Sequence, residues 1–223
     1  MLYCNNRLFK KVRSHKIGKK KMPPLFQQFV DKIEPLYDLT ILAVEYDSID
    51  IGPHEGRPRL NLIFEDQKSS DNIHKDRWTI KPHVKNRILK IFAEAVHDFQ
   101  EIEAYPTENI HLISDVFEDE AKNRAALELI ERKGKKLEEQ FLEYGVWTIT
   151  GMSKNIVVFF TDEKTKHQNM KNGICDLIRH ELFKKIKPYD EFTYFSEDSL
   201  EIHYDSKENL DDNYEGSLFY YFR

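Results

Sequence analysis

The sequence lacks the features of a membrane-spanning or a disulfide-stabilised protein. It has no apolar run that approaches the ~18 residues required by a bilayer-spanning helix. Its two cysteines, Cys4 and Cys175, are too few for a disulfide framework or for a zinc cluster built on cysteines. Such sparse use of cysteine is typical of the reducing cytosol. We therefore expect a cytoplasmic protein that does not associate with membranes.

The sequence also lacks the common motifs that indicate a particular catalytic or cofactor chemistry. The sequence has no Walker-type lysine loop, no dinucleotide-binding glycine fingerprint after a strand and no nucleophile-elbow motif. His180 and Glu181 are adjacent, but no second histidine lies one helical turn away, so the zincin spacing is missing. We expect Cys175 to be a small buried side chain rather than a nucleophile. The sequence therefore predicts no cofactor and no metal site.

The chain does contain enough apolar material for a hydrophobic core. It has 223 residues, of which 40% are hydrophobic and 13% aromatic. This composition argues against intrinsic disorder. The length is sufficient for one large domain or two small ones.

The net charge of −5 hides an uneven distribution along the chain. Residues 1–21 contain eight lysines and arginines and no acidic residue, whereas residues 22–223 contain 26 Lys/Arg against 39 Asp/Glu, a net charge of −13. Because an acidic body repels polyanions, we expect residues 22–223 not to bind nucleic acid.

The basic segment 1–21 has two interpretations. It is either an arm that binds nucleic acid or a membrane surface, or an extension outside the folded protein. Met22 resembles a natural first residue, because Pro23 and Pro24 follow it and open a helix. We favour the second interpretation and expect residues 1–21 to be disordered.

The charged stretch from Glu118 to Gly145 is the feature around which the fold is organised. Its apolar residues recur close to the helical period, so we expect a single central helix that passes through Gly134. The segments before and after it follow the same order of helix, hairpin, helix and strand. That similarity reflects either an ancient duplication or a common habit of α+β chains.

The hydrophobic patterns therefore predict an α+β fold with antiparallel or mixed sheets and packed helices, in two similar halves joined by a central helix. The halves are expected at 22–117 and 118–223, or as one compact domain at 22–223. Helices are expected at 24–34, 82–100 and 174–187, and strands at 39–46, 59–65, 77–80, 110–113, 146–150, 155–161, 192–195, 200–204 and 218–222. Polar connections are expected at 66–75 and 162–173.

A polar loop between two expected strands offers a catalytic interpretation. His54 and Glu55 form a base beside a carboxylate, and Arg57 and Arg59 are suited to hold a phosphate. The other interpretation is a glycine-rich hairpin loop with solvated charges. We favour this second interpretation, because nothing else in the sequence provides a partner for His54.

The last part of the chain carries the strongest compositional signal. From Asp190 to Glu215 there are ten acidic residues and one base, interleaved with tyrosines and phenylalanines. This pattern indicates either the solvated outer face of a sheet or a negative, partly aromatic face that binds a basic protein. The predicted partner-binding residues are Asp198, Glu201, Tyr204, Asp205, Asp211, Asp212 and Tyr214.

Taken together, the residues favour a binding protein over an enzyme. We expect a non-enzymatic inhibitor of a basic protein, in the manner of an immunity protein that occludes a nuclease-like toxin domain. The alternative is an enzyme that acts on a phosphorylated or nucleic-acid substrate through His54, Glu55, Arg57 and Arg59. A third interpretation is a structural or assembly subunit.

Overall fold

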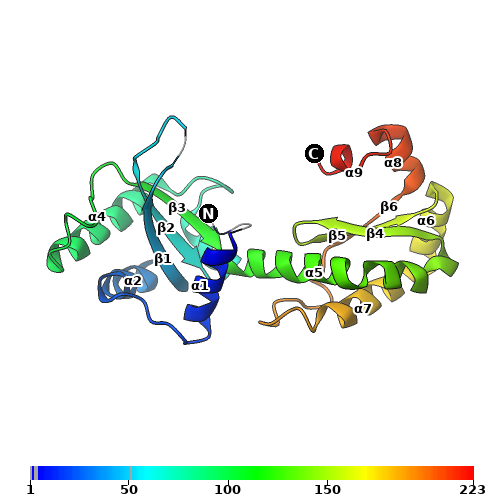
Figure 1. Ribbon diagram of the computed structural model, residues 1–223, viewed down its shortest axis with the longest axis horizontal. Coiled ribbons are helices and arrows are strands. Elements are labelled where there is room, and N and C mark those ends of the chain that lie inside the picture. Colours follow the sequence, from blue (N-terminus) through cyan, green and yellow to red (C-terminus); the bar gives the residue numbers. More distant parts are fainter. Residues whose placement is uncertain (1, 3–4, 51) are drawn as a thin grey trace. The chain divides into compact units, whose positions relative to one another are not determined.

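The structure is a computed structural model that describes Leu2, residues 5–50 and residues 52–223, so Met1, Tyr3, Cys4 and Ile51 lie outside the described residues. The chain divides into two compact units, Met1–Glu120 and Ala121–Arg223. Each unit contains a three-stranded mixed sheet with packed helices, and the long helix α5 (Phe117–Gln140) joins them (Figure 1). The predicted α+β class, with two similar halves and a central helix, is confirmed.

The first unit forms its sheet from a hairpin and one later strand. In chain order it contains α1 (Asn6–Lys16), α2 (Pro24–Tyr37), β1 (Ile41–Ser48), β2 (Pro58–Phe64), α3 (Gln67–Ile73), α4 (Pro82–Asp98) and β3 (His111–Val116). The strand order is β1-β2-β3, in which β1 is antiparallel and β3 is parallel to β2. The crossover between the two parallel strands runs through α3 and α4.

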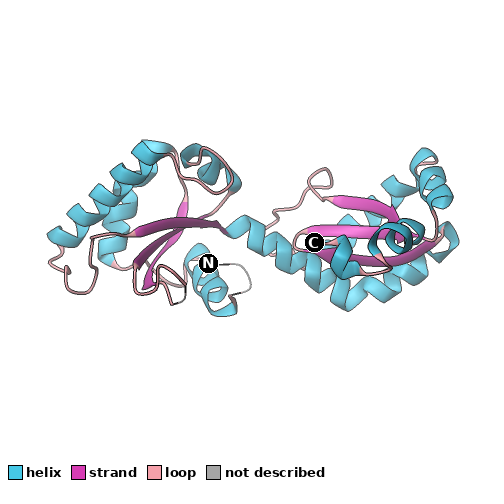
Figure 2. Ribbon diagram, turned by 90° about the horizontal axis from the view of Figure 1, so that it is seen from above, coloured by secondary structure: helices cyan, strands magenta, loops and turns pink. Residues whose placement is uncertain are grey.

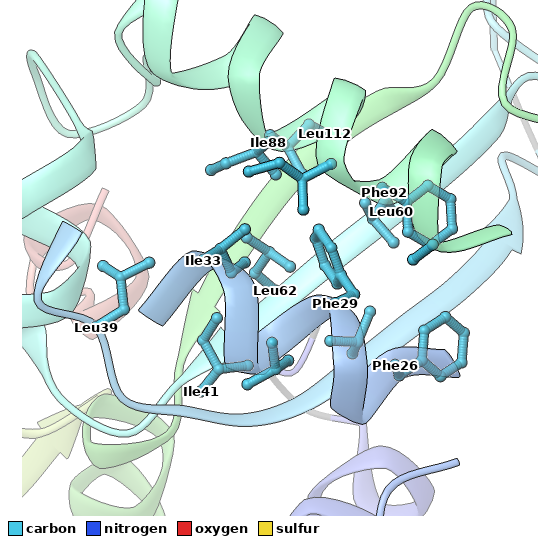
Figure 3. Packing of buried hydrophobic residues seen from close by; sticks show 14 of the residues in the cluster. Phe26, Phe29, Ile33, Leu39, Ile41, Leu60, Leu62, Ile88, Phe92 and Leu112 are labelled. Carbon is cyan, nitrogen blue, oxygen red and sulfur yellow. The ribbon is translucent and has the colours of Figure 1, made fainter. Parts of the chain in front are cut away.

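Alternation along β2 divides the first sheet into two faces. Leu60, Leu62 and Phe64 belong to a hydrophobic cluster with the apolar sides of α2 and α4 (Figure 3). Residues 59, 61 and 63 point to the opposite face, because successive strand residues alternate. Helix α1 lies against β1 on the side of the sheet away from α2 and α4 (Figure 1).

The second unit has the same sheet topology. After α5 it contains a short 3-10 helix η1 (Leu142–Tyr144), β4 (Val146–Met152), β5 (Asn155–Phe160), α6 (Glu163–Lys171), α7 (Ile174–Ile186), β6 (Ile202–Ser206), α8 (Lys207–Tyr214) and α9 (Leu218–Tyr221). Strand β4 is antiparallel and β6 parallel to β5. Figure 2 shows helices beside each of the two sheets.

Both faces of the second sheet are covered. Ile156, Val158 and Phe160 pack with α5 and α7, whereas Val157 and Phe159 pack with side chains of α8 and α9. The continuous apolar run of β5 therefore belongs to a central strand that is buried on both sides, as such runs predict.

The two units also share local details. Asp66 caps α3 by accepting a hydrogen bond from the Ser69 amide (2.8 Å). Asp162 caps α6 in the same way by accepting a hydrogen bond from the Thr165 amide (2.7 Å). The hairpin of each unit carries a register shift near its start. Asp115 of β3 lies opposite residue 63, and Asp205 of β6 lies opposite residue 159, at matching places in the two sheets. These matches extend the similarity of the two halves that the sequence predicts.

Several expected elements differ in the structure. The connections 66–75 and 162–173 contain α3 and α6, because their aspartate caps start helices. The expected strand 77–80 contributes only an isolated bridge between His74 and Ile80.

The two expected C-terminal strands at 192–195 and 218–222 differ as well. The Asp190 carboxylate accepts hydrogen bonds from the Tyr194 and Phe195 amides, so this segment turns instead of extending. Residues 218–221 form α9, whose first turn is closed by bonds to the Ser217 carbonyl.

The basic segment also differs from the expected disordered extension, since residues 6–16 form α1. The Asn5 side chain caps this helix, and Val12 is completely buried. None of the helices in the described part of the chain is long and apolar enough to cross a membrane.

Candidate partner-binding surface

Helix α8 presents carboxylates because of how it leaves the sheet. It starts directly after β6, where the buried Ser206 hydroxyl accepts a hydrogen bond from the Asn209 amide (2.9 Å). Leu210 points into the sheet and is buried. Asp211 and Asp212 lie on the other side of the helix and are exposed. The helix thus turns an apolar side to β5 and an acidic side to solvent.

The contacts of Tyr221 hold α9 against the same sheet. Its hydroxyl hydrogen-bonds to Asp205, and its ring makes edge contacts with Phe159 and Tyr214, each at a centroid distance of 5.0 Å. With Tyr221 facing inward, Phe219 and Tyr220 remain 71% and 46% exposed. Two large aromatic rings are therefore held in solvent by a short, anchored helix.

A groove of about 440 Å³ lies between α9 and β4. Its lining consists of Thr150, Met152, Leu218, Phe219, Phe222 and Arg223. Its volume is within the range of small-molecule pockets, about 300–1,000 Å³. Trp147, at an earlier position on β4, is 40% exposed and contacts the Phe159 ring edge-on.

We call the exposed side chains of this region the C-terminal surface, which consists of Trp147, Met152, Asp211, Asp212, Glu215, Phe219 and Tyr220. Lys207 connects its aromatic and acidic parts, because its ammonium lies 5.4 Å from the Trp147 ring centroid and pairs with Asp211. The side chains of Asp212 and Glu215 have no hydrogen-bond or ion-pair partner among the described residues, and both are exposed. Exposed aromatic anchors beside solvated charges are typical of protein-binding surfaces.

The seven predicted partner-binding residues do not form one patch. Asp211 and Asp212 lie on α8, at one end of β6. Asp198 and Glu201 are exposed but precede the other end of that strand. The whole length of β6 separates the two acidic pairs.

Tyr204, Asp205 and Tyr214 are engaged inside the second unit. The Tyr204 hydroxyl donates to the Cys175 carbonyl (2.6 Å), and Tyr214 packs against Tyr221. Asp205 accepts hydrogen bonds from the Ser206 amide (2.8 Å) and the Asn209 side chain. We therefore leave these three side chains out of the C-terminal surface.

The electrostatics of Asp205 agree with a structural role. Burial by itself raises the pKa of this carboxyl, but hydrogen bonds from Tyr221, Ser206 and Asn209 outweigh burial, so that the pKa is lowered from its ordinary value. Burial and the neighbouring Asp205 carboxylate both raise the pKa of Tyr221. The pair is thus held as a carboxylate and a neutral phenol, which fixes α9 on the sheet.

The predicted catalytic loop is divided in a similar way. His54 and Glu55 lie in an exposed turn. The Arg57 guanidinium donates to the Asn109 carbonyl (2.6 Å), and Arg59 forms a bidentate ion pair with Asp47 (2.8 and 2.7 Å). Both arginines are therefore engaged by the sheet and its adjoining loop.

These cations nevertheless act together on one histidine. His111, at the start of β3, lies opposite Arg59. Burial, followed by the charges of Arg57 and Lys85, lowers the pKa of His111 from its ordinary value, and His54 and Arg59 add to the effect. This end of the first sheet is thus a basic cluster built around a neutral histidine.

The lowered pKa of His111 predicts that the stability of the first unit depends on pH. Since the pKa of His111 is lower in the folded chain, the unfolded chain binds more protons as the pH falls below about 6.5. Stability should therefore decrease from pH 7.5 to pH 5.5, and His111→Gln should remove part of that decrease. Urea unfolding across this range measures it. His83→Gln, at an exposed site on α4, is the control; equal pH slopes for both variants would contradict the prediction.

Other candidate chemistries find little geometric support in the described residues. No group of three or more His, Cys, Asp or Glu side chains there is arranged to hold a metal ion. Cys175 is buried, and burial raises the pKa of its thiol to about 11, so its reactive thiolate form is scarce. Cys4 lies outside the described residues.

Sequence reasoning missed the apolar part of the C-terminal surface. The strand expected at 218–222 does not predict that Phe219 and Tyr220 are both exposed on a short helix. The signal lay in the pattern, because Leu218-Phe219-Tyr220-Tyr221-Phe222 does not alternate between apolar and polar residues, whereas a strand covered on one face does. Trp147 lies in the expected strand 146–150, whereas β4 extends beyond that range to include Met152.

Comparison of the chain with protein-family models, with curated proteins and with solved structures found no match.

Proposed function

We propose that this chain is a non-enzymatic protein-binding protein that occludes a basic partner, as an immunity protein occludes a nuclease-like toxin domain in the cytoplasm. The C-terminal surface is the observation that carries the proposal. It combines exposed aromatic side chains, an apolar groove and acidic residues on one face of the second unit.

The two kinds of side chain have separate tasks in this proposal. The carboxylates of Asp211, Asp212 and Glu215 attract a basic partner, which speeds association and makes it sensitive to salt. Phe219 and the groove beside it provide the apolar contact that slows dissociation. Occlusion follows when the partner's cationic, phosphate-binding side chains lie against the carboxylates.

A pull-down from the source cell, using the full chain as bait and mass spectrometry to identify retained proteins, tests the proposal. We expect one basic protein at near-equal stoichiometry, released by raising the salt. Phe219→Ala should reduce its retention at least about tenfold, because a buried aromatic anchor typically contributes 2 kcal/mol or more, which is about 30-fold. Asp212→Lys with Glu215→Lys should mainly slow association.

The control is a charge reversal of equal size at the other acidic pair, Asp198→Lys with Glu201→Lys. These residues lie at the opposite end of β6 and should leave retention unchanged. If the control variant loses binding and the Asp212 and Glu215 variant does not, the partner does not bind at the C-terminal surface. Retention of no basic protein would contradict the proposed function.

The basic cluster favours the second candidate function, an enzyme that acts on a phosphorylated or nucleic-acid substrate. His54, Arg57, Arg59 and Lys85 all lie close enough to act on His111. In this proposal Arg57 and Arg59 exchange their present partners for phosphate oxygens. Phosphoester hydrolysis by the full chain, abolished by His54→Ala, would favour this proposal over the binding protein.

A further inference from the structure

The face of the first sheet that lies opposite the α2 and α4 cluster carries both polar and apolar side chains. Cross-strand pairing places Glu45 beside Asn61 and Ile63 beside Asp115. Glu65 follows β2 at the same end of the sheet as Asp115. A sheet face that carries carboxylates between apolar residues is suited to bind a helix with lysines and apolar side chains on one side.

Helix α1 is such a helix, and it occupies this face. Lys11 pairs with Glu45 (2.6 Å), and Lys16 pairs with Glu65. Between these cations Val12 is fully buried, and the Phe9 ring stacks on the buried Phe117 ring at a centroid distance of 5.1 Å. The helix thus combines two ion pairs with two apolar anchors.

One acceptor on this face, the amide oxygen of Asn61, receives no hydrogen bond from the described residues. Asn61 is 3% exposed, and its amide nitrogen donates to Asp115 (2.7 Å). Its amide oxygen is buried. A buried acceptor without a donor is costly.

Helix α1 is short, and its connection to α2 is largely exposed. It is 11 residues long, and helices of that length are marginal in isolation. Residues 17–23 link it to α2, and most of them are exposed. A short helix that packs on the outside of a sheet opens more readily than the sheet beneath it.

We propose that this face of the first sheet is a docking surface for a basic amphipathic helix of a partner protein, and that α1 occupies it as an intramolecular substitute. The partner helix would carry lysines or arginines about five residues apart, to reach Glu45 and Glu65, with an apolar side chain between them. This inference rests on the proposed function in one respect only, namely that the partner protein is basic.

A labelled peptide with the sequence of residues 5–21 is the probe. In the intact chain the tethered α1 competes at high effective concentration, so we expect weak binding. Lys11→Glu with Lys16→Glu sets like charges against Glu45 and Glu65 and should expel α1. That variant should bind the probe at least about tenfold more tightly, since affinity scales with the open fraction.

Two controls separate docking from general charge attraction. Adding Glu45→Lys and Glu65→Lys to the expelled variant restores both ion pairs with reversed signs, and should return probe binding to the intact level or below. A peptide with Phe9→Ser and Val12→Ser keeps its charge and should bind weakly. Equal binding of both peptides, or equal binding by the intact and expelled chains, would overturn the proposal.

Hydrogen exchange of the isotopically labelled intact chain provides a test that does not require any substituted chain to fold. Excess probe should displace α1 and speed the exchange of its amides, while those of α4 stay unchanged. No change in α1 would overturn the proposal. Failure here is distinguishable from failure of the proposed function, because the variants that test that function lie on α8 and α9.

Discussion

Replacing Phe92 with alanine is expected to lower the free energy of unfolding of the first unit by about 3–5 kcal/mol. The Phe92 side chain is completely buried on α4, between the sheet and α2 (Figure 3). Its ring contacts Phe29 edge-on at 5.3 Å and stacks on Tyr46 at 5.9 Å. This loss of stability has two causes: less apolar surface is buried on folding, and the surrounding rings cannot fill the cavity that the substitution leaves.

Hydrogen exchange of the β2 amides at increasing urea measures the effect, because β2 is the central strand of this unit. The β5 amides of the second unit should be nearly unaffected. Trp78→Ala provides the control: this aromatic residue is 80% exposed, and its loss should cost within about 0.5 kcal/mol. A similar cost for both variants would show that Phe92 does not hold the core.

Replacing Gly151 with alanine is expected to destabilise the second unit by about 1–3 kcal/mol. A β-carbon at this position would lie 2.5 Å from the Asn155 carbonyl oxygen and 2.8 Å from the Ile130 side chain. The carbonyl belongs to the adjacent strand of the hairpin, so it cannot move without disturbing the β4-β5 register. Equilibrium unfolding followed through the β5 amides measures the cost.

Gly134→Ala is the matched control and should act in the opposite direction. A β-carbon there would have ordinary contacts, 3.7 Å from Ile130 and 3.8 Å from the Ile149 carbonyl oxygen. Because glycine inside a helix costs about 1 kcal/mol relative to alanine, this variant should be more stable by about that amount. If both variants destabilise, the space along α5 is tighter than its contacts indicate.

Much of the fold could be predicted because hydrophobic periodicity is a local signal. The amphipathic pattern of α4 and the four-residue spacing in α7 correspond to buried faces in the structure. Gly134 lies inside an unbroken α5, as expected. Local signals failed where one side chain redirects the backbone, as the Asp190 carboxylate does for Tyr194 and Phe195.

The candidate surface was less predictable because it depends on tertiary contacts. The sequence showed that acids and tyrosines gather after residue 190, but not which of them point inward. Asp205 and Asp212 are the same residue type, yet the first is enclosed by hydrogen bonds and the second is solvated. The basic segment was unpredictable for the same reason, because no local pattern shows that Lys11 and Lys16 form ion pairs with carboxylates of the sheet.

The parallel pairing of the third strand in each unit has a consequence for how the chain folds. The hairpins β1-β2 and β4-β5 close locally, but β3 and β6 pair with the central strands only after residues 65–110 and 161–201 have been gathered. Such non-local pairing is slow, because chain entropy is lost before the contacts form. Until then one edge of each central strand is bare, and the apolar run Val157–Phe160 is open to pairing with another chain. We therefore expect the pairing of β6, rather than formation of the hairpin, to limit the folding rate of the second unit and to end its exposure to aggregation.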